Sequence, residues 1–285
     1  MPKNNIIEAQ DCSPQQVYTR NDVIQTRQDI APSQSKKRKR RKKRSKVKVA
    51  SWYKLSQIQK KKFMDFKGYP VYYVNDLEIR NICLEDEEFT DFAIHYNFPD
   101  LIPENEIWVS EEVNKDELML FLNNAAKQYN LIKDGYDPDE AYEKAIKYEK
   151  SLREKIKNSE SYYSPSQPEA KKLSDNVHIQ RYGVITDEDI TVWIVNGKEV
   201  RDAYKTDYVE GGHGYVYDWI PNDEIWIDND TKDEERMAIL THEYTELKLM
   251  RDKNMEYEQA HHLASIEEYK FREGKENIWF IVSKE

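Results

Sequence analysis

The sequence has little cysteine and no long apolar run. Its 285 residues include two cysteines, Cys12 and Cys83, which are too few for a disulfide framework and fit a reducing compartment. There is no apolar N-terminal segment of the kind that signal peptides carry, and no run approaches the length of a membrane-spanning helix. The composition therefore predicts an intracellular protein, cytoplasmic or nuclear, that is not secreted by a signal peptide.

Positive charge is concentrated in one segment. Lys36–Lys48 (KKRKRRKKRSKVK) contains 11 basic residues and no acidic residue. Because this run contributes +11 to a formal net charge of −10, the rest of the chain carries −21. A flexible run of this kind is typical of a nuclear import signal, which binds an import receptor, and of a non-specific nucleic-acid tether. Both interpretations stay open, with a solubilising tail as a weaker third.

An internal duplication organises the remaining chain. VYYVNDLEIRN (Val71–Asn81) returns as VWIVNGKEVRD (Val192–Asp202), and DLIPENEIW (Asp100–Trp108) returns as DWIPNDEIW (Asp218–Trp226). An amphipathic stretch follows each copy of the second motif. We therefore expect the α+β class, with a small antiparallel sheet and two helices in each copy.

The composition also suggests where the copies begin and end. We expect a disordered arm at 1–50, a first copy at 51–157, a linker at 158–176 and a second copy at 177–285.

Local patterns predict individual elements. One short helix is expected within 51–68, and HIQRYGVI and ITVWIV flank the turn TDED as in a hairpin. Thr231–Glu234 has the spacing of a capping box at the start of the first helix of the second copy. Asn254 is expected to cap the second helix at its N-terminus.

In the first helix of the second copy, ionisable residues lie on the face that is expected to be buried. At about 100° per residue, Glu243 lies within the apolar arc, and His242 and Glu246 lie together at its edge. A buried lone carboxylate costs several kcal/mol unless it is paired or binds a metal. If the next helix packs antiparallel, His261 reaches His242 and Glu246. Two histidines and one glutamate would leave a fourth position open, as in catalytic zinc sites.

This stretch resembles the zincin metallopeptidases. His242 and Glu243 match the histidine and the general base of their HExxH motif, and His261 would be a third ligand. Glu246 replaces the second histidine of the motif. The resemblance implies a peptidase-like hydrolase that uses zinc and acts on a protein or peptide substrate. The EIW strand followed by HExxE and AHxxA helices is also similar to uncharacterised proteins encoded by phages or viruses, to which no activity is attached.

A non-enzymatic alternative explains the same residues. A buried His–Glu network can hold two helices together without a metal. The protein would then be an interaction protein of a virion or of chromatin, tethered to nucleic acid through residues 36–48.

The two copies differ at the proposed site. Opposite His242, Glu243, Glu246 and His261, the first copy has Asn124, Ala125, Gln128 and Tyr142. These exchanges favour a reactive second copy beside a silent first copy.

Other polar residues near the motif are less specific to the second copy. Glu268 has the counterpart Glu149, so we expect Glu268 to be structural and to orient a neighbouring ligand. His213 in GGHG, aligned with His95, is also expected to be structural, and a role in a substrate loop or in ligand binding is the alternative. Tyr244 and His213 are candidates for oxyanion donors.

Overall fold

The computed structural model of the chain describes residues 58–82, 89–160, 177–274, 280 and 282–283. These residues belong to one compact unit, Ser45–Glu285. The expected arm at 1–50, with the basic run 36–48, lies outside them. Helices and sheets are both present, which confirms the α+β class. None of the described helices combines the length and apolar character needed to cross a membrane.

The first copy is built around a four-stranded sheet. Its elements are, in chain order, β1 (Lys60–Phe66), β2 (Tyr69–Val74), α2 (Asp76–Ile82), β3 (Phe92–Ile94), β4 (Ile107–Ser110), α3 (Leu118–Lys133) and α4 (Pro138–Glu160). The strand order is β1-β2-β4-β3. The β2–β4 pair is parallel, and the two outer pairs are antiparallel.

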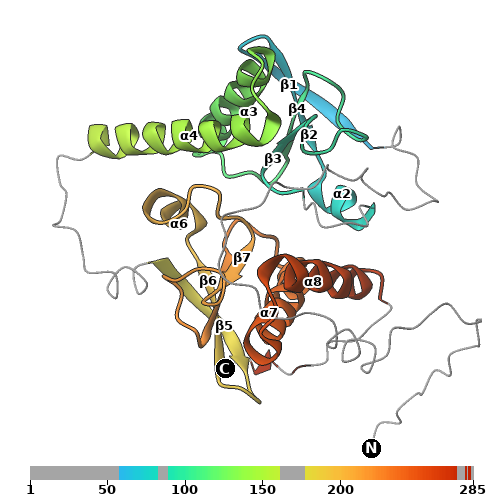
Figure 1. Cartoon of the computed structure of the whole chain (residues 1–285), viewed down its shortest axis with the longest axis vertical. Coiled ribbons are helices and arrows are strands. Elements are labelled where there is room, and N and C mark those ends of the chain that lie inside the picture. The colour runs from blue at the N-terminus through green and yellow to red at the C-terminus, as the bar shows by residue number, and fades with distance from the viewer. Residues whose placement is uncertain (1–57, 83–88, 161–176, 275–279, 281, 284–285) are drawn as a thin grey trace, which may run out of the picture. The chain divides into compact units, whose positions relative to one another are not determined.

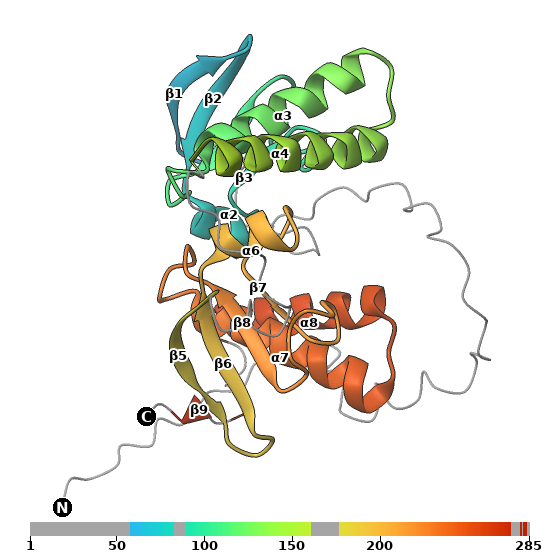
Figure 2. The same ribbon diagram turned by 90° about the vertical axis from the view of Figure 1, so that its left-hand side faces the viewer.

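The second copy repeats this arrangement. Its elements are β5 (His178–Ile185), β6 (Ile190–Val195), α6 (Gly197–Ala203), β7 (Gly211–His213), β8 (Glu224–Asp228), α7 (Arg236–Lys253), α8 (Tyr257–Arg272) and β9 (Val282–Ser283). The strand order is β7-β8-β6-β5-β9, so β5-β6-β8-β7 corresponds to β1-β2-β4-β3, and β9 is added at one edge. The duplication is thus present in the topology as well as in the sequence (Figures 1 and 2).

The sequence led us to expect purely antiparallel sheets, and this prediction is wrong. Both sheets are mixed. β6 and β8 run parallel, like β2 and β4. The chain between β6 and β8 passes through α6 and the edge strand β7, and a crossover of this length allows parallel pairing.

Each sheet has a hydrophobic core on both faces. In the second copy, apolar residues of β6 and β8 pack against α7 on one face, in a cluster that includes Val192, Ile225, Ile227, Ile239 and Leu240. The opposite face packs Trp226 against the region of α6. The first copy has the same two cores. Because α7 is seated on the sheet and α8 lies beside it (Figures 1 and 2), the face of α7 that meets α8 is fixed in position.

The helix ends of the second copy differ from those predicted. α7 begins at Arg236, and the Thr231 hydroxyl donates to the carbonyl of Asp228 at 2.6 Å instead of capping a helix. Asn254, expected at the start of the next helix, is the left-handed residue (φ 50°) that ends α7. Asparagine tolerates this conformation at a helix C-terminus, and it turns the chain so that α8 can begin at Tyr257.

Other local predictions have mixed outcomes. The hairpin is confirmed, since β5 and β6 pair antiparallel. The helix expected within 51–68 is wrong for Lys60–Phe66, which is strand β1, while residues 51–57 lie outside the described part of the chain. α4 extends to Glu160, into the range expected for the linker, and residues 161–176 are not among those described.

Candidate metal centre

Three side chains expected to converge do so in the second copy. His242 and Glu246 lie one turn apart on α7, and His261 faces them from α8. His242 Nε2 lies 3.1 Å from His261 Nδ1 and 3.8 Å from Glu246 Oε2. His261 Nδ1 lies 3.0 Å from the same Glu246 oxygen. One nitrogen or oxygen atom of each residue therefore points toward a common centre.

These distances fit a small metal ion. Ligand atoms about 2.0–2.1 Å from a tetrahedral zinc ion are separated from one another by roughly 3.3 Å, and the three observed separations lie between 3.0 and 3.8 Å. The group formed by His242, Glu246 and His261 can hold a metal ion. Little movement would be needed to bind it.

Glu268 fixes the tautomer of His242. Glu268 Oε2 lies 3.0 Å from His242 Nδ1, and an ionised carboxylate can only accept, so Nδ1 carries a proton and, in the neutral imidazole, Nε2 keeps its lone pair. Burial alone would raise the pKa of Glu268, but the hydrogen bonds from His242 and Arg272 outweigh it and lower the pKa to about 2. A carboxylate behind a histidine is the usual support of a metal-binding imidazole.

Glu246 is held by histidines on both of its oxygens. His213 Nε2 of β7 lies 3.0 Å from Glu246 Oε1, outside the angles of a regular hydrogen bond, and His261 meets Oε2. Burial raises the pKa of Glu246, but the interactions with His213, His242 and His261 outweigh burial, so the net shift of the pKa is downward. Glu246 is therefore ionised at neutral pH.

A second group, formed by His213, Glu243 and Glu246, also has the spacing of a metal site. The backbone N–H of Tyr215 donates to His213 Nδ1 at 3.2 Å. In a neutral imidazole the proton then lies on Nε2, the atom that faces Glu246, and leaves no lone pair there. The group centred on His242 is the better ligand set, because the hydrogen bond to Glu268 leaves the lone pair of a neutral His242 on Nε2, the atom that faces the other two residues. His261 Nδ1 lies between His242 Nε2 and Glu246 Oε2 and would lose its proton when a metal ion binds.

Strand pairing corrects the expected alignment of His213. His213 pairs with Ile225 in the second copy, and in the first copy Ile94 pairs with Ile107, the counterpart of Ile225. The counterpart of His213 is therefore Ile94, not His95. The loops before the EIW strands differ in length by one residue, so an alignment without gaps places His213 opposite the wrong residue of the first copy. His213 touches the site through Glu246.

Glu243 lies against the edge strand β7. A Cβ atom at Gly211 would come within 2.9 Å of Glu243 Oε1 and 3.1 Å of its carboxyl carbon, so a larger residue here would displace the Glu243 carboxyl group from its present position. Burial, reinforced by the charge of Glu246, raises the pKa of Glu243 to about 8. In the first copy, Phe92 stands opposite Gly211 and Ala125 opposite Glu243, and both belong to the hydrophobic core.

The cluster opens toward solvent at one side chain. The side chain of His261 is 26% exposed, whereas those of His242 and Glu246 are 5% and 4% exposed. The half-exposed ring of Tyr257 stacks on His261, with centroids 5.4 Å apart. Tyr244 packs against Phe280 and interacts with Glu188; this placement does not support Tyr244 as an oxyanion donor.

The first copy keeps the frame without the ligands. Asn124 Nδ2 donates to Glu149 Oε2 at 2.6 Å, and Gln128 Nε2 donates to Asn124 Oδ1 at 2.7 Å. Tyr142 turns to Asp207, with its hydroxyl 3.4 Å from Oδ2. Within the described residues, both metal-capable groups belong to the second copy.

Comparison with models of protein families, with curated proteins and with solved structures finds no match for this chain.

Proposed function

We propose that the second copy binds one zinc ion through His242, Glu246 and His261 and hydrolyses peptide-like substrates. The observation that carries this proposal is the convergence of the three ligand atoms, with His242 Nε2 left unprotonated by the hydrogen bond from Nδ1 to Glu268. A structural His–Glu pair would need no third ligand and no exposed side of the cluster.

The donor set favours zinc over harder cations. Two imidazole nitrogens and one carboxylate oxygen are typical zinc ligands, and three protein ligands characterise catalytic rather than structural sites. Calcium and magnesium prefer oxygen ligands throughout. The partly exposed edge at His261 supplies access for a substrate or a water molecule.

Glu243 is the proposed general base. Zinc held by three protein groups supplies Lewis acidity and makes water acidic enough to lose a proton near neutral pH. Glu243 follows a ligand in sequence, and Gly211 leaves room for its carboxyl group beside the cluster. A zinc ion beside this carboxyl group would favour its ionised form and so oppose the rise in pKa that burial causes. The carboxylate would then take the proton from water and return it to the leaving amine.

Metal content of the purified full-length protein tests the zinc site. We expect about one equivalent of zinc, as in other three-ligand sites, lost in His261→Ala and retained in His262→Ala. His262 is a suitable control because it is the next residue on α8 and its side chain is exposed. A protein that binds no zinc and keeps its melting temperature in chelator would contradict the proposal.

A peptide library tests the reaction separately. We expect Glu243→Gln to keep the zinc and lose cleavage. Cleavage that survives this substitution would contradict the role of Glu243, and a zinc-loaded protein that cleaves none of the peptides would contradict a peptidase-like activity.

Residues 36–48 motivate a second proposal about location and partners. The run of 11 basic residues would take the protein to the nucleus through an import receptor or tether it to nucleic acid. If the metal site fails its test, the protein is better described as a non-enzymatic interaction protein with a buried polar network. Deleting 36–48 should abolish nuclear accumulation or salt-sensitive DNA binding; a deletion that changes neither would contradict this role.

A further inference from the structure

The two copies contact each other through ion pairs that occur twice with the copies exchanged. Arg201 of the second copy binds Glu117 of the first, with Nε–Oε1 at 2.9 Å. Arg80 of the first copy binds Glu235 of the second, with a nitrogen–oxygen distance of 3.3 Å. Arg80 corresponds to Arg201 in the duplicated motif, and Glu117 and Glu235 each precede the first residue of the equivalent helices α3 and α7. Such reciprocity is the signature of a twofold interface.

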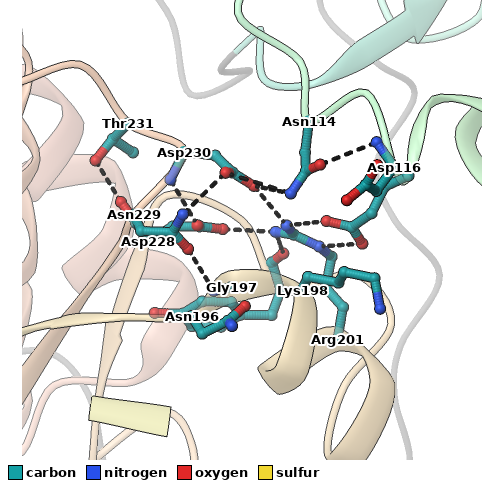
Figure 3. Close-up of polar contacts among 12 residues, drawn as sticks. Asn114, Asp116, Asn196, Gly197, Lys198, Arg201, Asp228, Asn229, Asp230 and Thr231 are labelled. Carbon is teal, nitrogen blue, oxygen red and sulfur yellow. Dashed lines mark hydrogen bonds and ion pairs between the residues drawn. The ribbon is translucent and has the colours of Figure 1, made fainter. Parts of the chain in front are cut away.

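A second reciprocal pair supports the same arrangement. Asn114 of the first copy lies 3.4 Å from Asp230 (Figure 3). Its counterpart Lys232 lies 3.5 Å from Glu112, the counterpart of Asp230. Figure 3 shows Arg201, Asn114 and Asp230 meeting in one polar network. The duplicated chain is therefore packed like a symmetric dimer joined into one polypeptide.

From Arg80 a continuous chain of charged groups leads to the candidate ligand His242. Glu235, which Arg80 contacts, also accepts from Arg272 at 2.5 Å. Arg272 in turn donates twice to Glu268 Oε1, at 2.9 and 2.6 Å. Glu268 then holds His242 at 3.0 Å. All these side chains are at most 9% exposed, so the contacts are only weakly screened by water.

Arg80 also reaches the other support of the site. Its guanidinium lies 2.7 Å from Glu210 Oε1. Glu210 has a positive φ of 59°, which is uncommon for a residue with a long side chain. It precedes Gly211, the residue that makes room for Glu243, and the same strand carries His213. One arginine of the first copy thus contacts both paths that position the cluster.

We infer that Arg80 of the silent first copy is a positioning residue for the metal centre of the second copy. This inference rests on the proposed zinc site. Arg80 contacts both Glu235 and Glu210. Through Glu235 it positions His242, and through Glu210 it positions the strand residue Gly211, against which Glu243 packs. The first copy is then a built-in support of the site rather than a remnant.

Arg201 provides a matched control because its chain has the same form and ends at no ligand. It binds Glu117, which accepts from Arg153 at 2.6 Å. Arg153 donates to Glu149 at 2.9 and 2.6 Å, and Glu149 accepts from Asn124. Arg201 also donates to Asp228 and Asp230 of its own copy. Its path through Glu117 ends in the first copy, whereas the path from Arg80 through Glu235 ends at the metal centre, so we expect only a change at Arg80 to weaken metal binding.

The test compares Arg80→Lys with Arg201→Lys in the full chain. Zinc affinity is measured by competition with a chromophoric chelator, and the visible spectrum is recorded with Co²⁺ in place of zinc. We expect Arg80→Lys to weaken zinc binding about threefold to thirtyfold and to shift the Co²⁺ spectrum. Arg201→Lys should lower the melting temperature similarly and leave both readouts as in the wild type.

Equal losses of zinc affinity in both variants, or an unchanged zinc affinity in Arg80→Lys, would overturn the inference about Arg80. The proposed zinc site would still stand if the wild type binds zinc. A wild type without zinc would overturn both. If a lysine variant does not fold, Glu235→Gln and Glu117→Gln make the same comparison one step along each chain, with the loss expected only for Glu235→Gln.

Discussion

The two copies share a buried arginine–glutamate pair and differ in the side chain that the glutamate contacts. In each, an arginine on the last helix grips a glutamate with the same pair of distances, 2.9 and 2.6 Å, and that glutamate holds a side chain of the preceding helix. The held side chain is Asn124 in the first copy and His242 in the second. The buried arginine–glutamate pair alone is therefore not evidence of a functional site. The evidence is the replacement of Asn124 by His242 at the position that the glutamate contacts.

One exchange involves two positions that must change together. The second copy combines Gly211 with Glu243, and the first combines Phe92 with Ala125. Either mixed combination would leave a gap or force a clash, because a Cβ atom at Gly211 would lie 2.9 Å from the Glu243 carboxylate. The small residue at position 211 thus accompanies the longer side chain at position 243, and the large Phe92 accompanies Ala125.

The largest expected effect follows from making the second copy resemble the first at one ligand. Glu246→Gln replaces an ionised ligand with the residue found as Gln128, and we expect zinc affinity to fall by more than about a hundredfold. Isothermal titration with zinc measures it. The reverse change, Gln128→Glu, should add no second zinc equivalent. Retained affinity in Glu246→Gln would remove this residue from the ligand set.

A smaller effect is expected behind the ligand. Glu268→Gln removes the acceptor that fixes the His242 tautomer, and zinc affinity should drop about tenfold to a hundredfold. Glu149→Gln breaks the equivalent bond in the first copy and should leave zinc affinity unchanged, with a comparable loss of melting temperature. If both variants bind zinc equally well, Glu268 is structural only.

The paired exchange predicts a coupling in stability. Gly211→Ala crowds Glu243 and should cost about 1–3 kcal/mol in the free energy of unfolding. In a Glu243→Ala background the cost should largely disappear, giving a coupling of about 1 kcal/mol or more. Urea unfolding of the four proteins of this cycle measures the coupling, and additive effects would show that the two positions are independent.

The smallest effect concerns pH and the interface between copies. Burial raises the pKa of Asp91 from 3.8 to about 7, despite the opposing charge of Arg201. The folded state therefore favours protonated Asp91, and this contribution to stability is lost as the pH rises from about 4 through about 7. In Asp91→Asn the free energy of unfolding should depend less on pH between about 4 and 7 than it does in the wild type.

Asp202 gives the opposite sign and serves as the control. Hydrogen bonds from Lys198 and Arg153 outweigh burial and lower its pKa. Its contribution is present at neutral pH and is lost as the pH falls through the folded-state pKa, so Asp202→Asn should destabilise the protein at neutral pH only. An unfolding profile of Asp91→Asn parallel to the wild type would contradict the assignment to Asp91.

Helical periodicity was sufficient to find most of the candidate site. His242 and Glu246 share a helix face because they are four residues apart, and the apolar arc of α7 decides that this face is inward. The duplicated motifs likewise determined the repeated topology. These features depend on neighbours in sequence, and local patterns encode them directly.

Predictions that depended on distant partners were less successful. The lysine-rich segment Lys60–Phe66 is a strand because it pairs with β2, which its own composition does not indicate. The counterpart of His213 followed from strand register and not from an ungapped alignment. Both cases turn on pairing between segments, which periodicity within one segment does not specify.

The sequence by itself determined that the protein is duplicated, that its class is α+β and that His242, Glu243, Glu246 and His261 distinguish one copy from the other. Only the tertiary structure decided which imidazole nitrogen of His242 is unprotonated, that His213 supports Glu246, and that Arg80 of one copy reaches the site of the other. The physical reason is that composition and spacing set which face of a helix is buried, whereas the orientation of a buried polar side chain is set by the partner that packing brings to it.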